Sequence, residues 1–368
     1  MRISKPTSPP DYLFLAAIII LVVFGFVMLA SASSDLAKDR FGDGYYYIKH
    51  QAINGFVIGI LGFLTGLLVY YRRWERLAVS LLVVNIILLI LVFTPLGLSS
   101  KGAARWLEFG SFSFQPSEVL KLTFLIYIAA WIVSGRKRNK SFSEGLLPFV
   151  VIVAVIAFIL FKQPSTTIAA LIFFTSIIMY FAAGARFSFL AIFFALGAIG
   201  FSLVVYLTPY RFARIITYIK PESANSLAEG YHINQALTAI GSGGLFGTGY
   251  GRSTTKLHYL PEPIGDSIFA VIGEELGFAG SLAFLFLFFF LIWRGFMIVR
   301  QTTEKFGKTL VIGFTSIMAL QSFVNIGAVS GLLPLTGVPL PFVSFGGTSL
   351  AVFLTMGGII LNVSRYRR

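Results

Sequence analysis

The sequence contains no cysteine and few acidic residues or histidines, with 15 Asp and Glu and 3 His among 368 residues. Without cysteine there is neither a disulfide framework nor a thiolate metal site. The three histidines (His50, His232 and His258) are scattered and form no HExxH pair, so a zinc hydrolase is unsupported. A GxSxG nucleophile elbow is also lacking.

Long apolar runs make up most of the chain instead. The sequence is 57% hydrophobic and 12% charged, with a mean hydropathy of +0.85, unlike a soluble globular protein. Runs of about 20 apolar residues recur along its length, each able to cross a bilayer as a helix. We therefore expect an all-α polytopic membrane protein, a single integral membrane domain over residues 1–368. Its ten predicted transmembrane helices cover residues 12–31, 51–71, 77–95, 119–134, 146–161, 166–183, 187–208, 266–293, 309–330 and 343–363.

Basic residues gather in every second loop. The formal net charge of +14 would suggest nucleic acid as a partner of a soluble protein, but the positive-inside bias of membrane loops explains it better here. The first apolar run is as long as the others and has no clear cleavage site, so we expect a retained helix. With ten spans, both termini are then cytoplasmic. The basic residues predicted inside are Arg2, Lys5, Arg72, Arg73, Arg76, Arg136, Lys137, Arg138, Lys140, Arg186, Arg294, Arg300, Lys305, Lys308, Arg365, Arg367 and Arg368.

The largest predicted loop is extracytoplasmic, lies between helices 7 and 8 and covers residues 209–265. Its aromatic and glycine content and a short predicted helix at 231–240 indicate that it is ordered. Its glycine-rich segment 241–253, GSGGLFGTGYGRS, lacks the Gly-Lys-Ser/Thr of a P-loop, and no strand precedes it. Either its backbone N–H groups approach a diphosphate, or it is a flexible turn.

An acidic residue marks the end of this loop, in LPEPIGDSIFAVIGEELG (Leu260–Gly277). Asp266 stands at the head of the eighth apolar run, where an ionisable residue is a candidate functional residue. At 100° per residue, a strip of small side chains continues below it. The strip fits either close helix packing or a groove for a lipid chain whose head group lies at Asp266. Its residues are Ala270, Gly273, Gly277 and Gly280.

Two more acids, Glu274 and Glu275, lie deeper in the same run. By helix geometry they point away from the small-residue strip. A transporter would use such acids near the bilayer midplane. Their direction instead favours helix-packing or hydrogen-bonded acids.

Several cations are predicted on the same side of the membrane as Asp266. Arg105-Trp106 and the pair Glu118 and Lys121 bracket a QPSE segment at the mouth of the fourth span. Arginine and lysine suit a diphosphate, whereas charges three residues apart could instead neutralise each other and Trp106 could be an interfacial aromatic. The large loop adds two more cations, Arg211 and Arg214.

The last helix is preceded by prolines and begins with glycines, in PLPFVSFGGTSL (Pro339–Leu350). Broken helices at membrane depth are tolerated where the backbone lines a cavity. The N-terminus of the following helix would favour an anion. This segment is therefore another candidate part of the site.

Four ordered motifs resemble one known family: RWxxxG…FQPSE…K, AIGSGGxxGxGxG, LPEPxGDSIFAVIGEELG and PLPFVSFGGTS. They are similar to the SEDS family (shape, elongation, division and sporulation) of FtsW/RodA type, with the FtsW branch closer, over nearly the whole chain. The resemblance implies a peptidoglycan glycosyltransferase that polymerises lipid II on the outer face of the bacterial cytoplasmic membrane, in cell division or elongation. It also implies a class B penicillin-binding protein and other divisome or elongasome membrane proteins as partners, and no nucleic acid.

The family's essential aspartate matches Asp266, and its arginine before tryptophan matches Arg105. The chain departs from many members at Gly265 and Ser267 beside Asp266, at Ser165 where an acid is common, and at Ser113 where a basic residue is common. The candidate substrate-binding residues are Arg105, Trp106, Gln115, Glu118, Lys121, Arg211, Arg214, Gln235, Glu262, Ser344, Gly346 and Gly347. No metal ligand is assigned, and a divalent cation, Mg²⁺ or Mn²⁺, remains a candidate cofactor.

The expected chemistry is a direct inverting displacement. Asp266 would act as general base on a sugar hydroxyl, and the cations would stabilise the leaving diphosphate. A lipid II flippase is the main alternative, and a scaffold that recruits a transpeptidase is a third. Glycan synthesis in detergent separates polymerisation from flipping, because flipping requires a membrane.

Overall fold

The computed structural model describes residues 6, 8–100, 103–109, 112–135, 141–206, 208, 212, 228–257 and 259–367. Most of them lie in helices, and three short strands lie between α4 and α5. Helix η1 continues α2 into α3, and η3 leads into α6. The elements are α1 Tyr12–Phe41, α2 Tyr46–Gln51, η1 Ala52–Val57, α3 Ile58–Leu68, α4 Arg72–Leu91, β1 Gly97–Ser100, β2 Ala103–Phe109, β3 Phe112–Phe114, α5 Pro116–Val133, η3 Phe142–Leu146, α6 Leu147–Lys162, α7 Thr166–Ala182, α8 Phe187–Tyr206, α10 Ala228–Ser242, α11 Ile268–Gln301, α12 Lys305–Val329 and α13 Gly347–Ser364.

The predicted class of polytopic helical membrane protein is confirmed. Within the residues described above, eight helices are long and apolar enough to cross a membrane. Two further apolar helices, Thr166–Ala182 and Phe187–Gly200, are shorter. Each predicted span therefore has an apolar helix, while the count of ten transmembrane helices stays a prediction.

Helix α1 is longer than its predicted span, because it continues from residue 31 to Phe41. Asp11 caps its start by accepting a hydrogen bond from the N–H of Phe14, and Gly42 ends it in the left-handed conformation at φ 70°. Thirty residues give a helix of about 45 Å, longer than a bilayer core of about 30 Å. Hydropathy detected the membrane part of the helix and missed its polar extension.

A small antiparallel sheet is the departure from the predicted all-α fold. Its strands follow the order β1-β2-β3, with Leu98 opposite Trp106 and Glu108 opposite Ser113. The predicted spans leave residues 96–118 as a connection between the third and fourth helices, since strands of three to seven residues produce a weak periodic signal. The sheet places Arg105 and Trp106 on β2.

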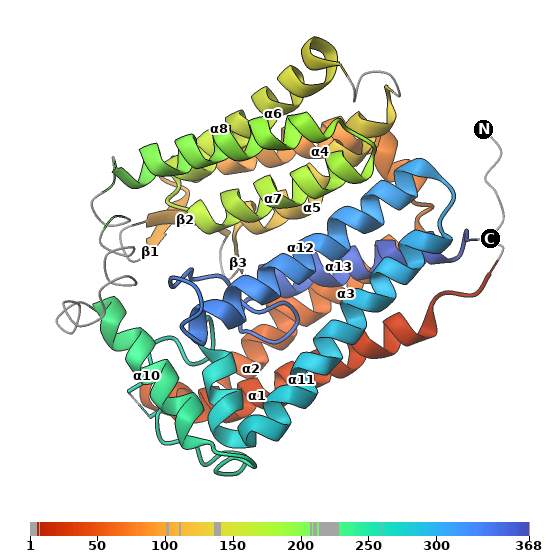
Figure 1. Ribbon diagram of the computed structural model, residues 1–368. Coiled ribbons are helices and arrows are strands. Elements are labelled where there is room, and N and C mark those ends of the chain that lie inside the picture. The colour runs from red at the N-terminus through yellow and green to blue at the C-terminus, as the bar shows by residue number, and fades with distance from the viewer. Residues whose placement is uncertain are drawn as a thin grey trace.

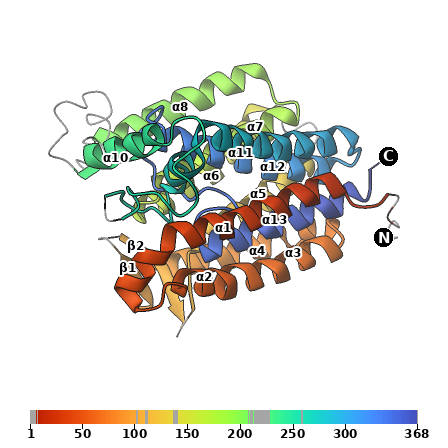
Figure 2. The same cartoon turned by 90° about the horizontal axis from the view of Figure 1, so that it is seen from below.

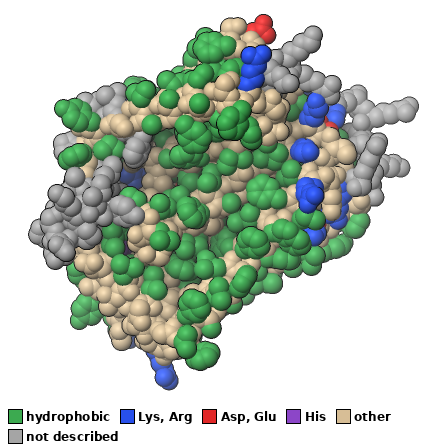
Figure 3. All heavy atoms as spheres, viewed as in Figure 1, with side chains coloured by type: hydrophobic (Ala, Val, Ile, Leu, Met, Phe, Trp, Pro, Cys, Tyr) green, Lys and Arg blue, Asp and Glu red, His purple; other side chains and the backbone are tan. Residues whose placement is uncertain are grey.

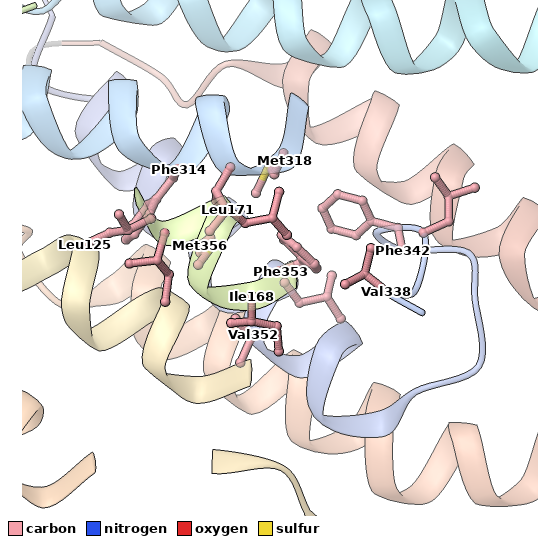
Figure 4. Close-up of a cluster of buried hydrophobic side chains, with 14 of the residues drawn as sticks. Leu125, Ile168, Leu171, Phe314, Met318, Val338, Phe342, Val352, Phe353 and Met356 are labelled. Atoms are coloured by element: carbon pink, nitrogen blue, oxygen red, sulfur yellow. The ribbon is translucent and has the colours of Figure 1, made fainter. Parts of the chain in front are cut away.

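The helices α12 and α13 form the centre of the molecule, since most of their residues are buried. Figure 4 shows a cluster of apolar side chains around them, in which Leu125 of α5 and Leu171 of α7 pack near Phe314, Phe353 and Met356. This cluster holds the central helices against their neighbours.

Helix α13 also packs closely against α3, because small residues line the contact. A Cβ at Gly358 of α13 would lie 2.2 Å from the backbone carbonyl oxygen of Phe63 on α3, so glycine is required for this approach.

Both termini lie at one end of the molecule, as Figures 1 and 2 show. The sheet and α10 lie at the opposite end, which we call the distal end. Figure 3 shows apolar side chains over the middle of the surface and Lys and Arg side chains near the end that carries the termini. This distribution agrees with a bundle that spans a membrane with its basic loops on one side.

Candidate active site

Asp266 lies in a compact turn, not in the helix that follows. Ser267 is the N-cap residue of α11, which begins at Ile268. The carbonyl of Glu262 accepts hydrogen bonds from the N–H groups of Gly265, at 3.1 Å, and Ser267, at 3.2 Å. Glu262 reaches this geometry with a left-handed φ of 50°, which is strained for a residue with a side chain. We call residues 260–267 the Asp266 turn.

Three separate elements hold the tripeptide Gly265–Ser267. The hydroxyl of Ser344, before α13, donates to the carbonyl of Gly265 at 2.7 Å. The amide of Asn325 on α12 donates to the carbonyl of Asp266 at 2.8 Å. The imidazole Nε2 of His232 on α10 lies 2.6 Å from the hydroxyl of Ser267. The backbone on both sides of the candidate base is therefore restrained.

The carboxylate of Asp266 is half-buried and faces the connection between α12 and α13 (residues 330–346). A Cβ at Gly337 would lie 3.4 Å from Asp266 Oδ2. Gly337 has a φ of 65°, a conformation that glycine adopts most easily. A glycine here leaves space beside the carboxylate that a side chain would occupy.

Glu118 and Lys121 form a buried ion pair inside the bundle. Their side chains are 3% and 0% exposed, and Lys121 Nζ lies 2.7 Å from Glu118 Oε2. Lys121 also donates to Gln321 Oε1 at 2.7 Å, and Gln321 donates to the carbonyl of Pro339 at 2.7 Å. The pair thus supports the α12–α13 connection from within, and its ammonium group is closed to solvent.

Arg105 extends from β2 to the corner between α6 and α7. Its Nε donates to the carbonyl of Gln163 at 3.3 Å, and its Nη2 to that of Pro164 at 2.7 Å. At the same corner Thr167 donates to the carbonyl of Thr336 at 2.9 Å, next to Gly337. Arg105 is therefore connected to the surroundings of Asp266 through this corner. The corner includes Ser165, the position where an acid would be common in the family that the sequence resembles.

The residues at the start of α13 pack against α2, η1 and α5. Gln51 accepts a hydrogen bond from the N–H of Gly346 at 3.0 Å. A Cβ at Gly347 would lie 2.9 Å from the carbonyl oxygen of Asn54. The N–H of Gln115 donates to Thr348 Oγ1 at 3.2 Å. Protein groups thus occupy part of the helix N-terminus that we expected to favour an anion.

The other candidate residues differ in exposure. Trp106 on β2 and Gln235 on α10 are half-buried, and the side chain of Glu262 is exposed. Arg211, Arg214 and His258 lie outside the described residues.

Of the two interpretations of the small-residue strip below Asp266, the lipid groove is wrong. Helix α11 is broken at Gly277, where φ is 66° and ψ is −166°, so no continuous helical face runs from Asp266 to Gly280. The small residues are also covered, because a Cβ at Gly273 would lie 3.1 Å from Ile240 and one at Gly277 would lie 2.2 Å from the N atom of Gly247. The alternative of close packing is correct, with α10 and the glycine-rich segment as the packing partners.

Two N–H groups of the glycine-rich segment bind the break in α11, so they are not available to a diphosphate, which was one of the two interpretations of this segment. Thr248 N donates to the carbonyl of Glu274 at 2.9 Å, and Gly249 N to that of Glu275 at 3.1 Å. In return Phe278 N donates to the carbonyl of Gly244 at 2.9 Å. The segment thus pairs the backbone groups that the break releases.

The side chains of Glu274 and Glu275 are hydrogen-bonded and buried, as their helical direction indicated. Glu274 accepts from Ser253 Oγ at 2.6 Å and from the hydroxyl of Thr255. Glu275 pairs with Lys256 at 2.8 Å and accepts from Ser31 of α1 at 2.6 Å. Both acids therefore hold residues 253–256 against α1 and α11.

Across the described part of the chain, no group of three or more His, Asp or Glu side chains could hold a metal ion. Mg²⁺ is commonly bound by one or two carboxylates together with substrate phosphates. The Asp266 turn carries one further acid, Glu262, whose side chain is exposed. Cation binding would then require the substrate.

Sequence reasoning missed Gln321 and Asn325. Gln321 links Lys121 to Pro339, and Asn325 links the carbonyl of Asp266 to that of Val338. A signal was present, because Gln321 and Asn325 are the two amide side chains of α12 and lie four positions apart, a spacing that puts both on one face. It noted His232 but not its contact with Ser267, which depends on the tertiary placement of α10.

The fold and this turn together define a polytopic helical membrane protein with a restrained acidic turn at its distal end. A model of the cell cycle protein family FTSW_RODA_SPOVE matches residues 11–368. The chain belongs to this family.

The chain is similar to the stage V sporulation protein E of Bacillus subtilis, with 38% identity over 99% of both chains. A probable peptidoglycan glycosyltransferase FtsW of Trichlorobacter lovleyi is 40% identical over 96% of this chain and 93% of the relative. Among solved structures, a peptidoglycan synthase complex that coordinates polymerization and crosslinking matches with a TM-score of 0.81 and 26% identity, covering 98% of this chain and 99% of that one. The rod shape determining protein RodA of Thermus thermophilus matches with a TM-score of 0.69 and 26% identity over 97% of both chains.

Proposed function

We propose that the chain is a peptidoglycan glycosyltransferase that polymerises lipid II, with Asp266 as the general base. The observation that carries this proposal is the placement of the carboxylate. Asp266 is half-buried in a turn whose carbonyl groups are held by α12 and the segment before α13 and whose Ser267 side chain contacts α10. A general base must be held within hydrogen-bond reach of the proton that it removes, and a restrained turn meets this requirement.

The reaction forms a glycosidic bond and breaks the bond between an anomeric carbon and a diphosphate. Asp266 takes the proton of the attacking sugar hydroxyl, and the leaving diphosphate carries away the electron pair of the broken bond. Arg105 and the loop cations Arg211 and Arg214 are the proposed partners of that diphosphate. A divalent cation held by Glu262 and the substrate diphosphate would add charge neutralisation when bound.

Lys121 and Glu118 have a positioning role in this proposal. They lie inside the bundle and are linked to the α12–α13 connection through Gln321. That connection contains Gly337, beside the Asp266 carboxylate. Ser344, Gly346 and Gly347 likewise support the site from the start of α13, while Trp106, Gln115 and Gln235 remain proposed substrate contacts or supports.

The chain would work in the bacterial cytoplasmic membrane with both termini in the cytoplasm. The basic side chains near the termini support this orientation, and the distal end with Asp266 would then face outward. Similarity to a peptidoglycan synthase complex supports a transpeptidase partner, which we propose is a class B penicillin-binding protein in division or elongation.

The experiment that tests the proposal is glycan synthesis by the purified full-length chain from lipid II in detergent. A polymerase makes glycan strands without a membrane, whereas a flippase needs two compartments. We expect strands that a muramidase digests. Transport of lipid II in vesicles without any polymer in detergent would instead support the flippase alternative.

A further inference from the structure

His232 and Ser267 connect the helix α10 to the Asp266 turn. The His232 Nε2 atom lies 2.6 Å from Ser267 Oγ, and Ser267 Oγ donates to the carbonyl of Pro261 at 2.9 Å. A hydroxyl group has one proton to donate. Since that proton goes to the Pro261 carbonyl, the hydrogen in the contact with His232 must belong to Nε2 of the imidazole.

Helix capping does not explain this arrangement. A serine at the N-cap usually accepts a hydrogen bond from an N–H group in the first turn of its helix. Ser267 is the N-cap residue of α11 and makes no such bond. Its fully buried side chain instead links Pro261, at the start of the Asp266 turn, to α10.

We infer that His232 is a positioning residue for the proposed reaction: its Nε2–H holds Ser267 and thereby directs the neighbouring Asp266 carboxylate toward the substrate. This inference rests on the proposed function. Ser344 and Asn325 already restrain the carbonyl groups of Gly265 and Asp266. His232 adds a restraint on Ser267, the third residue of this tripeptide. A displacement of a catalytic group by about 1 Å can cost about a hundredfold in rate.

The test compares two amide substitutions of His232 in the purified full-length chain with lipid II in detergent. His232→Gln places an amide N–H near the position of Nε2, whereas His232→Asn places it near Nδ1, out of reach of Ser267. We expect His232→Asn and His232→Ala to lower kcat by about 10- to 100-fold, with KM changed by less than about twofold. His232→Gln should recover kcat to within about threefold of the native chain.

A double-mutant cycle with Ser267→Ala tests the path of the effect. If His232 acts through Ser267, the second substitution adds no further loss. The rate of the double variant His232→Ala/Ser267→Ala should then equal that of the slower single variant. The matched control is Asn234→Ala, a position two residues along α10 from His232, which should retain the native rate. Thermal unfolding of each variant separates loss of positioning from loss of folding.

The inference is overturned if Gln and Asn at position 232 give equal rates, or if the losses in the double variant multiply. Should His232→Ala fail to fold, the Gln and Asn pair decides the question, because both keep a polar side chain of similar size. A native chain that makes no glycan at all would contradict the proposed function instead. An active native chain with unaffected His232 variants would contradict this inference alone.

Discussion

The ammonium group of Lys121 lies 2.7 Å from the carboxylate of Glu118, and neither side chain is more than 3% exposed. Buried charges are stable only with their partners, and removal of one partner typically costs about 3–5 kcal/mol. The pair could therefore be replaced as a unit with less damage than either residue alone.

We accordingly expect Lys121→Met and Glu118→Gln each to lower the thermal unfolding midpoint strongly in detergent. The double variant Glu118→Gln/Lys121→Met should be more stable than either single variant, because no unpaired charge remains. If Lys121 mainly bound substrate, Lys121→Met would keep its stability and lose only activity. Circular dichroism during heating distinguishes these outcomes.

The break in α11 leads to a prediction at Gly277. A Cβ there would lie 2.2 Å from the N atom of Gly247, and the φ of 66° is unfavourable for alanine. Gly277→Ala should lower the free energy of unfolding by more than about 1 kcal/mol. Gly241→Ala is the matched control, since a Cβ added there would meet nothing within 4 Å, and it should be neutral or slightly stabilising. Equal unfolding midpoints for the two variants would contradict the tight clamp around α11.

Glu274 provides a test of the transporter alternative. It accepts hydrogen bonds from Ser253 and from the N–H of Thr254 at 2.8 Å, which indicates a structural role. Glu274→Gln weakens these charge-assisted bonds, so we expect a stability loss of about 1–3 kcal/mol with the polymerisation rate of the folded fraction unchanged. Loss of lipid II transport in vesicles with native stability would favour a transporter.

Asp11 leads to a pH-dependent prediction. Burial raises the pKa of its carboxyl, but hydrogen bonds from Arg294, the N–H of Phe14 and Arg367 outweigh burial and hold the pKa below its ordinary value of 3.8. The stabilisation is therefore complete above pH 3.8 and is lost as the pH falls through the lowered pKa.

At pH 7 we expect Asp11→Asn to unfold at a lower temperature than the native chain, by the equivalent of about 1–3 kcal/mol. The difference should shrink below pH 3.8, as the native carboxyl becomes protonated. Asp35→Asn, an exposed acid farther along α1, should behave like the native chain at both pH values. A difference that does not change with pH would show that the charge of Asp11 is unimportant.

Hydropathy predicted the apolar helices well, because a membrane span requires a long run of apolar side chains. It missed features that depend on backbone hydrogen bonds outside the helix pattern. The extension of α1 to Phe41 is polar, the strands β1 to β3 are short, and the break at Gly277 lies inside an apolar run. The break exists because the glycine-rich segment pairs with the released backbone groups, which no local pattern specifies.

The motif around Asp266 pointed to the candidate base, but its surroundings depended on tertiary structure. The pairing of Glu118 with Lys121 was one of two open interpretations, and the structure places both inside the bundle. The spacing of Gln321 and Asn325 was readable and was not used. The contact between His232 and Ser267 joins residues 35 positions apart, and sequence periodicity carries no information about it.

Asp266→Asn provides the most direct test of the account, measured as glycan synthesis from lipid II by the purified chain in detergent. The matched control is Asp43→Asn, an acid paired with Lys49 beyond the end of α1. We predict that Asp266→Asn lowers the rate of glycan synthesis by about 10²- to 10⁴-fold, while its unfolding midpoint stays equal to that of the native chain. Asp43→Asn should keep the native rate. Full polymerisation by folded Asp266→Asn would contradict the assignment of Asp266 as the general base.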